Sequence, residues 1–570
     1  MPTIEVRRDD LESLLGIELP KDLEELNSIL AFVKGEAKLA EGPEIRIELK
    51  DSNRADIWGV EGLARALKGY LDLERGLKNY QIVDASGVDV NVDPRLKDIR
   101  PYIACSVVKN VKLTDAAIKQ IMHFQDKMDQ TYGRNRRRTS IGVYDFDLIT
   151  PPLRYGVAKP QEISFVPLEL VEKLTLEEIL EKHPKGIEYG HIVRHHPVWP
   201  IFIDSEDKVL SFPPIINSID LGRVTEQTRN VLVEVTGTTH ETVLDTLTNV
   251  TLSLADREGR IHSTRIHYPY RGMGEVETPL LSTDVFQINV DYVKKVLGIK
   301  LTIREIRSLL ERSRYGVVKI TKTQMVVKVP CYRVDILHPI DIVEDIAIAY
   351  DYNMIQPRWP QLLTIGGLAS ETEFRNVIRE IMIGLGYQEI LSFSMTDPEN
   401  LFTKMESKPE KVVEVANPKL ASMTCLRNWL LPSLLEFLSN NTHLQYPQRI
   451  FEIGYCALHD EEQETKTKEP EKLAAVTIHS QASFTEAKSI MDALLANLGI
   501  SFQLEPCSHG SFIEGRAGNV LVRNCRAGII GELHPQVIQN WGLENPTAAF
   551  EVNLADLKQG AGRSIETAHP

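Results

Sequence analysis

Four carboxylates cluster at the start of an expected helix near residue 340. Asp341, Glu344 and Asp345 are spaced i, i+3 and i+4, so they share one helix face, and Asp335 just before the helix can join them. Like charges this close repel each other, and a hard cation such as Mg²⁺ relieves the repulsion. The spacing is therefore compatible with a magnesium site. The alternative is a solvated helix N-terminus, where the macrodipole favours acidic residues.

A single carboxylate inside an apolar strand is the second candidate. Glu234 lies in the middle of the segment 231–236, between Val233 and Val235. A buried carboxylate is unfavourable unless it is paired or faces a cavity. Thr236 is two residues further on and therefore lies on the same face of the strand.

A rigid turn upstream supplies a polar amide beside apolar walls; its notable residues are Pro213, Pro214 and Asn217. Together with Glu234 and Thr236 it could form a pocket that holds an aromatic side chain and senses a hydroxyl on it. The alternative is that Glu234 forms a salt bridge at a sheet edge, with Arg229 or Arg265. The residues alone leave both interpretations open.

Other chemistry is weakly indicated. The sequence has no GxSxG, GxxxxGK[ST] or HExxH motif. His195 and His196 could bind a metal, but the other histidines have no matching spacing, so we interpret them as ordinary surface or core residues. The arginine-rich run 134–138 could contact RNA phosphates, or it could be a solvated turn.

Composition narrows the class of protein. The 570 residues predict about three to five domains. The formal net charge of −15 argues against a protein that only coats nucleic acid. The six cysteines lack CxxC spacing, which fits a reducing cytoplasm. No apolar run is long enough to span a membrane, and the N-terminus lacks the apolar core of a signal sequence.

An internal repeat organises the chain. The segment Leu15–Leu19 is echoed by Leu297–Leu301, and Arg54-Ala-Asp56-Ile is echoed by Arg333-Val-Asp335-Ile. We interpret the two copies as related small α+β modules, of which the second carries the additional carboxylates. Between and after them, periodicity predicts helices over 116–132, 371–385 and 430–438, a helix directly after a Thr238–Glu241 capping box, strands over 141–146, 231–236, 389–393 and 449–453, and a surface loop over 460–472.

Six motifs together resemble those of the phenylalanine–tRNA ligase beta subunits of the archaeal and eukaryotic type, over nearly the whole chain to about residue 558. They are FPPIINS at 212–218, TRNV at 228–231, YRVDI at 332–336 with the acidic cluster, LRNWLLPSLL at 426–435, RIFEIG at 449–454 and GIIGELHP at 528–535. The resemblance implies a multidomain α+β fold. Two related small α+β modules, at 1–85 and 275–355, flank a mixed α/β editing domain at 86–274. A class II synthetase-like antiparallel sheet domain without catalytic motifs follows at 360–558, and 559–570 form a tail.

The resemblance also implies a function. An alpha subunit would activate phenylalanine with ATP and charge tRNA(Phe) in a cytoplasmic α₂β₂ heterotetramer, while this subunit hydrolyses mischarged Tyr-tRNA. Its editing pocket maps to Pro213, Pro214, Asn217, Glu234 and Thr236. Asp335, Asp341, Glu344 and Asp345 match a Mg²⁺ site at the contact with the alpha subunit. A class II active site also needs an arginine-bearing strand, near Arg449 here, and a Gly-x-Gly-x-x-Arg helix, which the sequence lacks after residue 533.

Two other functions compete with this one. The chain could be a non-enzymatic scaffold that binds its partner and tRNA and keeps only a vestigial pocket. It could also be an independent metal-dependent hydrolase that uses the acidic cluster. That last possibility is disfavoured because one small module has little room to enclose a substrate as well.

Overall fold

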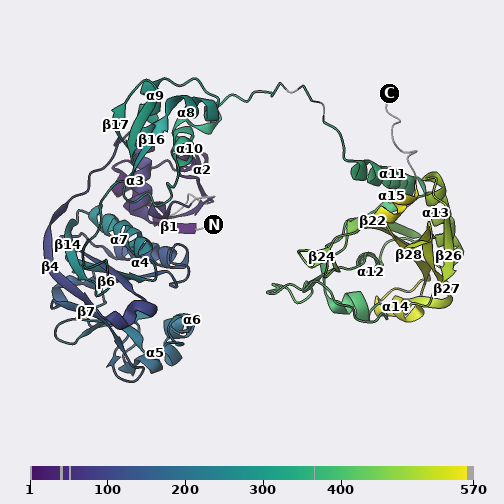
Figure 1. Ribbon diagram of the computed structural model, residues 1–570, viewed down its shortest axis with the longest axis horizontal. Helices are drawn as coiled ribbons and strands as arrows, with labels where there is room; N and C mark the ends of the chain where they lie inside the picture. The colour runs from purple at the N-terminus through teal and green to yellow at the C-terminus, as the bar shows by residue number, and fades with distance from the viewer. Residues whose placement is uncertain (1–2, 39–42, 51–52, 362, 365, 562–570) are drawn as a thin grey trace. The chain divides into compact units, whose positions relative to one another are not determined.

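The computed structural model describes residues 3–38, 43–50, 53–361, 363–364 and 366–561. The chain divides into two compact units, which we call the N-terminal unit (1–359) and the C-terminal unit (360–570) (Figure 1). The expected tail begins inside an ordered helix, α15 (Leu554–Gly560), and its residues from 562 onward lie outside the described part of the chain.

The two segments that echo each other in sequence fold with the same order of elements, strand–helix–helix–strand–strand–helix. The first repeat contains β1 (Thr3–Arg7), α1 (Arg8–Leu15), α2 (Leu23–Leu30), β2 (Gly35–Ala37), β3 (Glu44–Leu49) and α3 (Val60–Tyr70). The second contains β16 (Val285–Asn289), α8 (Val290–Leu297), α9 (Ile303–Arg312), β17 (Gly316–Ile320), β18 (Gln324–Lys328) and α10 (Pro339–Tyr350). Their sheets have matching strand orders, β1-β3-β2 and β16-β18-β17.

Local chemistry explains why these two sequence echoes recur. Gly16 and Gly298 end the first helix of each repeat in the left-handed conformation, with φ of 81° and 67°, which glycine adopts without a Cβ clash. The Arg-x-Asp echo also has one geometry. Arg333 donates two hydrogen bonds to Asp335, at 2.8 and 2.7 Å, and Arg54 does the same to Asp56, at 3.2 and 2.7 Å.

Between the repeats lies a ten-stranded mixed sheet. Its strands, in spatial order, are β12 (Ile216–Asn217), β11 (Val209–Phe212), β10 (Trp199–Ile203), β7 (Leu153–Ala158), β4 (Ile82–Val92), β14 (Arg260–His267), β5 (Tyr102–Lys109), β13 (Val231–Gly237) and β6 (Thr139–Asp145), with β15 (Glu275–Thr278) paired to β14. Because β15 belongs to this sheet, the expected boundary at 275 is about ten residues too early, and the second repeat begins at β16. We call this part the large-sheet domain.

The two ends of the large sheet approach each other. Asn217 on terminal strand β12 lies within hydrogen-bonding reach of Tyr144 and of the Val143 carbonyl on terminal strand β6, at 3.4 and 3.5 Å. Small elements complete the domain: β8 (Ser164–Phe165), β9 (Leu174–Thr175), α5 (Leu176–Lys182) and α6 (Pro184–Tyr189). The sheet is therefore curved, and side chains from strands far apart in its order share one interior.

Two longer helices pack on the large sheet close to where periodicity predicts them. They are α4 (Asp115–Gln130) and α7 (His240–Ala255). The predicted Thr238–Glu241 capping box is wrong. The chain is still in β13 through Gly237, the N-cap is Thr239, and that residue makes no side-chain cap hydrogen bond.

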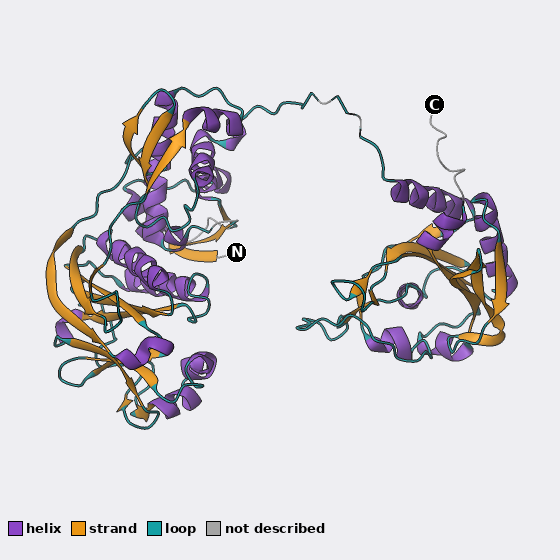
Figure 2. Ribbon diagram, viewed as in Figure 1, coloured by secondary structure: helices purple, strands orange, loops and turns teal. Residues whose placement is uncertain are grey.

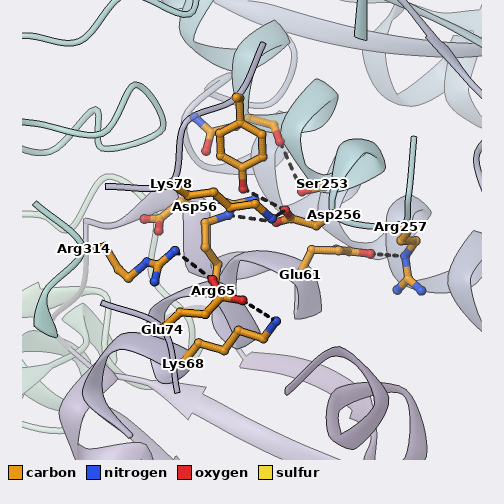
Figure 3. Close-up of polar contacts among 12 residues, drawn as sticks. Asp56, Glu61, Arg65, Lys68, Glu74, Lys78, Ser253, Asp256, Arg257 and Arg314 are labelled. Carbon is orange, nitrogen blue, oxygen red and sulfur yellow. Dashed lines mark hydrogen bonds and ion pairs between the residues drawn. The ribbon is translucent and has the colours of Figure 1, made fainter. Parts of the chain in front are cut away.

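Buried ion pairs join the large-sheet domain to the first repeat (Figure 3). Arg65 on α3 contacts Asp256 at 2.7 Å, just beyond the end of α7. Arg257 contacts Glu61 on α3 at 2.5 Å and Asp10 on α1 at 2.8 Å. One continuous hydrophobic core also runs through both repeats and the inner face of the large sheet. The N-terminal unit is therefore held together by apolar packing and paired charges.

The C-terminal unit is built on a seven-stranded sheet in the order β19 (Gln388–Glu389), β22 (Gln448–Tyr455), β25 (Glu471–Ile478), β29 (Thr547–Asn553), β28 (Cys525–Leu533), β27 (Phe512–Val522) and β26 (Phe502–Pro506). Its neighbouring strands are antiparallel except β19 and β22, which are parallel. The predicted strand 389–393 is wrong beyond Glu389, and a short hairpin, β23 (Leu458–His459) with β24 (Thr467–Lys468), interrupts the predicted 460–472 loop.

Alternating side chains give this sheet two apolar faces, and helices lie on both sides of its strands (Figure 2). One face packs on α11 (Ser370–Gly384), α13 (Phe484–Asn497) and α15, and the other on α12 (Leu431–Asn440) and α14 (Pro535–Asn540). The small strands β20 (Met395–Thr396) and β21 (Cys425–Leu426) form a separate pair. Among the described residues, no helix is long and apolar enough to cross a membrane.

Candidate functional site

Glu234 is buried at the centre of the large sheet. It lies on β13, opposite Cys105 of β5 and Gly142 of β6, and is only 2% exposed. The Tyr144 hydroxyl, two residues beyond Gly142 on β6, donates a hydrogen bond to Glu234 Oε2 at 2.7 Å. The predicted buried carboxylate therefore has a phenol as its partner.

Gly142 makes room for this contact. A Cβ at that position would lie 2.2 Å from the Tyr144 hydroxyl oxygen and 2.5 Å from Glu234 Oε2. Both distances are far below van der Waals contact, so any larger residue would force the two side chains apart. The absence of a side chain opposite Glu234 is what lets the phenol reach the carboxylate.

Burial raises the pKa of Glu234 to about 7, although the Tyr144 hydrogen bond, the charge of Arg100 and the Thr236 hydroxyl each lower it in part. Removing a carboxylate from water disfavours its charged form, and neutral hydrogen-bond donors compensate less than a direct ion pair would. The carboxyl group therefore titrates near neutral pH and can serve either as a hydrogen-bond acceptor or, when protonated, as a donor.

Arg100 organises the neighbouring polar groups. It donates to the Thr236 hydroxyl at 2.9 Å, to the Thr236 carbonyl at 2.7 Å and to the Ser140 hydroxyl at 3.0 Å. The structure thus brings Thr236 to the same interior as Glu234, as its spacing predicts. Burial lowers the pKa of Arg100 from its ordinary value.

The turn upstream also reaches this site. Asn217 Oδ1 lies 3.4 Å from the Tyr144 hydroxyl, close to its contact with Glu234. Pro213 and Pro214 are buried in the turn between β11 and β12, where Arg136 donates to the Pro214 carbonyl at 3.2 Å. Arg136 comes from the arginine-rich run and also pairs with buried Asp129 at 3.0 Å. Arg136 therefore connects parts of the fold, whereas Arg134 and Arg137 are exposed.

The alternative salt bridge for Glu234 is wrong. Arg229 donates to the backbone carbonyls of Glu226 and Thr228. Arg265 lies 3.9 Å from both Asp89 and Glu277 on the solvent side of the sheet. Neither arginine faces the interior that holds Glu234.

The acidic cluster lines one small cavity of about 50 Å³ between the two repeats. The Arg333 guanidinium lies between two of these carboxylates. It contacts Asp335 at 2.7 Å and Asp345 at 2.8 Å, and its side chain is only 2% exposed. Burial by itself would raise the pKa of Asp335, but the adjacent Arg333 guanidinium outweighs burial and holds that pKa below its ordinary value. The two inner carboxylates therefore already share one buried cation.

The two outer carboxylates have different roles. Asp341 accepts hydrogen bonds from the backbone amides of Leu337 and His338, both at 2.8 Å, and so caps α10. Glu344 has a half-exposed side chain and pairs with Lys34 of the first repeat at 2.6 Å. The helix-capping interpretation is therefore confirmed for Asp341, whereas the magnesium site stays a prediction.

As arranged here, these carboxylates do not fit a metal centre by themselves. Within the part of the chain that the structure describes, no group of three or more His, Cys, Asp or Glu residues is placed to hold a metal ion, and this includes His195 and His196. The reason at the cluster is the pairing of Asp335 and Asp345 with a buried guanidinium. A bound cation would need that guanidinium to move or further oxygen ligands from elsewhere.

The arginine-bearing strand of the C-terminal unit has its own partners. Arg449 on β22 pairs with Glu486 at 2.9 Å, and Glu452 is fully buried against Arg427 at 2.8 Å. A cavity of about 650 Å³ lies at the other end of the strands, beside Lys472. Lys472 pairs with Gly454 of β22. Gly454 lies five positions beyond Arg449, which corresponds to roughly 16 Å along the strand. Arg449 is therefore not positioned to hold phosphates in that cavity.

Two important residues, Tyr144 and Arg100, could not be identified from sequence patterns alone, whereas a third, Arg333, could have been. Tyr144 and Arg100 reach Glu234 and Thr236 only through the pairing of strands that lie about a hundred residues apart. Arg333 had a usable signal, since the Arg-x-Asp echo occurs in both repeats, where each arginine pairs with the aspartate two residues later.

Comparisons with known proteins find relatives over nearly the whole chain. Residues 286–352 match the model of the tRNA synthetase B5 domain, and 355–554 match that of the phenylalanyl-tRNA synthetase beta chain CLM domain. The phenylalanine–tRNA ligase beta subunit of Pyrococcus furiosus is 45% identical over 98% of this chain and 100% of that protein. That of Methanosphaera stadtmanae is 37% identical with the same coverage.

A solved structure covers the N-terminal unit. It is an N-terminal fragment of the phenylalanyl-tRNA synthetase beta subunit from Pyrococcus horikoshii, 42% identical, with a TM-score of 0.58 over 61% of this chain and 99% of the fragment. Together these matches define a subunit class among the aminoacyl-tRNA synthetases. The chain belongs to the phenylalanine–tRNA ligase beta subunit family.

Proposed function

We propose that this chain is the beta subunit of an α₂β₂ phenylalanine–tRNA ligase. With its alpha subunit it forms Phe-tRNA from ATP, phenylalanine and tRNA(Phe) in the cytoplasm. The observation that carries this proposal is full-length similarity at 45% identity to a relative of that name. In the complex, the alpha subunit makes the adenylate. The pairing of Arg449 with Glu486 supports this division, because that arginine is already neutralised.

The second activity of the chain is hydrolysis of mischarged Tyr-tRNA in the large-sheet domain. Tyrosine differs from phenylalanine by one hydroxyl. An apolar pocket at an aminoacylation site discriminates against an added hydroxyl by a factor of only about 10². A separate site that binds the hydroxyl can remove the error. Glu234 supports this role, since it is a buried carboxylate that already accepts a phenolic hydrogen bond, from Tyr144 at 2.7 Å.

In this site Glu234 accepts the hydroxyl of the tyrosyl group. Thr236 and Arg100 keep the carboxylate in a polar, pre-organised surrounding, and a charge-assisted hydrogen bond is stronger than a neutral one. Asn217 and the Pro213–Pro214 turn border the same interior. A water molecule attacks the ester, whose tRNA ribose is the leaving group.

Deacylation of preformed Tyr-tRNA tests this role. Glu234→Ala should reduce hydrolysis by the α₂β₂ complex at least tenfold, because the hydroxyl loses a charged partner. The matched control is Glu277→Ala, which changes an exposed glutamate on β15 of the same sheet. Undiminished hydrolysis by the Glu234 variant would favour the scaffold function with a vestigial pocket.

Co-purification tests the ligase assignment. The full chain expressed with its alpha subunit should form a heterotetramer that charges tRNA(Phe), whereas the chain alone should make no adenylate. ATP–pyrophosphate exchange by the isolated chain would contradict the proposed division between the subunits.

Magnesium at the acidic cluster belongs to the same proposal as a site shared with the alpha subunit. Asp341 and Glu344 would be its accessible ligands, and Asp335 and Asp345 would join if Arg333 releases them. The ion would supply charge neutralisation at a subunit contact. Titration calorimetry with MgCl₂ should show tighter binding to the complex than to the isolated chain, and the difference should disappear in Glu344→Gln. Equal binding by complex and chain would exclude the shared site.

A further inference from the structure

The phenol bound to Glu234 in this structure belongs to the chain itself. Tyr144 is completely buried, and its hydroxyl lies 2.7 Å from Glu234 Oε2. The backbone of Gly142 lies against the same two groups, so closely that even a methyl group there would clash with both. A second phenol can therefore reach that oxygen only after the Tyr144 hydroxyl has left it.

We propose that Tyr144 is an internal competitor of the substrate for Glu234 in the editing site. Its hydroxyl occupies the position of the substrate hydroxyl and leaves only in exchange for another hydroxyl-bearing ring. This inference rests on the proposed role of Glu234 in binding the tyrosyl group. It adds a residue that no sequence motif of the chain marks.

The exchange explains how the correct product is protected. A tyrosyl group that displaces Tyr144 forms the same hydrogen bond to Glu234, so the carboxylate stays paired throughout. A phenylalanyl group has no hydroxyl, and its entry leaves a buried carboxylate without that donor. Unpaired buried polar groups are strongly unfavourable, whereas exchanging one equivalent partner for another is nearly neutral. With Tyr144 in place, binding of a tyrosyl group at Glu234 is therefore nearly neutral, whereas binding of a phenylalanyl group is unfavourable.

The surroundings of Tyr144 suit such a movement. It lies one residue from the end of β6, a terminal strand of the large sheet that pairs with β13. Asn217 Oδ1, at 3.4 Å, is a second acceptor placed beside the hydroxyl. Phe202 contacts the ring edge-on, with centroids 6.3 Å apart. Asn217 can thus accept the hydroxyl hydrogen bond when the Tyr144 ring shifts away from Glu234.

Tyr155 provides a matched control. It is equally buried, it also packs edge-on against Phe202 with centroids 6.5 Å apart, and its hydroxyl donates to the Arg100 carbonyl at 2.9 Å. Removing its hydroxyl deletes one buried hydrogen bond from the same sheet without freeing Glu234.

The experiment compares Tyr144→Phe and Tyr155→Phe in the α₂β₂ complex, with Tyr-tRNA and Phe-tRNA as substrates for deacylation. Tyr144→Phe should raise kcat/KM for both substrates by about tenfold, since neither has to break a charged hydrogen bond. The ratio between the two substrates should stay the same, because tyrosine still gains one bond that phenylalanine lacks. Tyr155→Phe should behave like the wild type. An unchanged or lower rate with Tyr144→Phe would overturn the inference.

A second measurement covers the case in which Tyr144→Phe does not fold. A 3-fluorotyrosine at position 144 of the otherwise wild-type complex reports displacement by ¹⁹F NMR. Its resonance should shift on addition of a non-hydrolysable tyrosyl-amide analogue of the tRNA 3′ end, and not with the phenylalanyl analogue. A saturating tyrosyl analogue that leaves the resonance unmoved would contradict the exchange. If Glu234→Ala keeps full editing, the proposed function itself fails; if that variant loses editing while Tyr144→Phe changes nothing, only the exchange fails.

Discussion

Glu234 in the large sheet and Asp335 between the repeats are both buried carboxylates, yet their pKa values move in opposite directions. The pKa of Glu234 is raised to about 7, and that of Asp335 is lowered. Burial pushes both upward, so the difference lies in the partner. Asp335 is held by the Arg333 guanidinium at 2.7 Å, while Glu234 has a phenol at 2.7 Å. A guanidinium fixes the charge of a carboxylate, whereas a phenol leaves it able to titrate and to change partners.

This difference in partner distinguishes a structural contact from a site at which the bound group can be exchanged. Arg333 joins Asp335 and Asp345 within the second repeat and holds both carboxylates in place. In the proposed exchange, a chemically equivalent group replaces Tyr144 at Glu234. Variants at these two sites test this contrast, from the largest expected effect to the smallest.

Removing Arg333 should be the most damaging change. Arg333→Met leaves two buried carboxylates without their cation, which should lower the free energy of unfolding by about 3–5 kcal/mol. Denaturant unfolding of the full chain measures it. The control, Arg307→Met, breaks a half-exposed i,i+4 pair with Glu311 on α9 and should change stability by less than about 0.5 kcal/mol. Similar effects of the two variants would show that Arg333 is not the structural cation.

The pH dependence of stability should differ in sign at the two carboxylates. Because the folded-state pKa of Glu234 lies above its ordinary value of 4.5, the folded chain binds this proton more tightly, and stability falls as pH rises from about 4.5 to about 7. Glu234→Gln should therefore gain about 2 kcal/mol relative to the wild type between about pH 5 and pH 8.

Asp335 has the opposite dependence. Its folded-state pKa is depressed, so its contribution to stability is present above its ordinary value of 3.8 and is lost as pH falls through the lower folded-state pKa. Asp335→Asn should destabilise the chain at neutral pH, and the loss should shrink under acid conditions. Parallel pH profiles for the Glu234 and Asp335 variants would remove the contrast between the sites.

The Tyr144 hydroxyl should tune Glu234 directly. Since its hydrogen bond lowers the pKa of Glu234, Tyr144→Phe should raise that pKa further above 7. Infrared detection of the protonated carboxyl group in isotopically labelled chain can follow the titration. A pKa that falls in this variant would mean that the phenol does not stabilise the carboxylate.

The smallest effect is expected at the outer edge of the acidic cluster. Lys34→Ala breaks a half-exposed pair with Glu344 and should cost less than about 1 kcal/mol of stability. It should nevertheless increase the affinity of the complex for Mg²⁺, because Glu344 loses a competing cation. Weaker Mg²⁺ binding in this variant would place the ion elsewhere.

Local patterns predicted the elements better than the contacts. The helices expected at 116–132 and 371–385 are present as α4 and α11 within two residues at each end, because their apolar spacing matches one buried face. The strand expected over 389–393 ends at Glu389, since Leu391 and Phe393 remain largely exposed and, among the described residues, no strand of the sheet pairs with them. A short apolar run does not reveal whether a neighbouring strand is available.

The sites show the same limit. Sequence spacing places Glu234 and Thr236 on the same face of one strand. Tyr144 reaches Glu234 because the strand register sets Gly142 opposite Glu234, and this register cannot be seen in the sequence. At the acidic cluster, spacing identifies the carboxylates but not their partner Arg333, which lies two residues before Asp335. Spacing shows that negative charges lie close together. It does not show that the Arg333 side chain folds back onto its own segment and compensates these charges.

The most direct test of the central claim is the level of Tyr-tRNA that accumulates when the α₂β₂ complex is supplied with tyrosine, ATP and tRNA(Phe). The wild-type complex should hold almost none, and the Glu234→Ala complex should accumulate Tyr-tRNA while charging phenylalanine at the normal rate. Equally low Tyr-tRNA in both complexes would contradict the assignment of editing to this carboxylate.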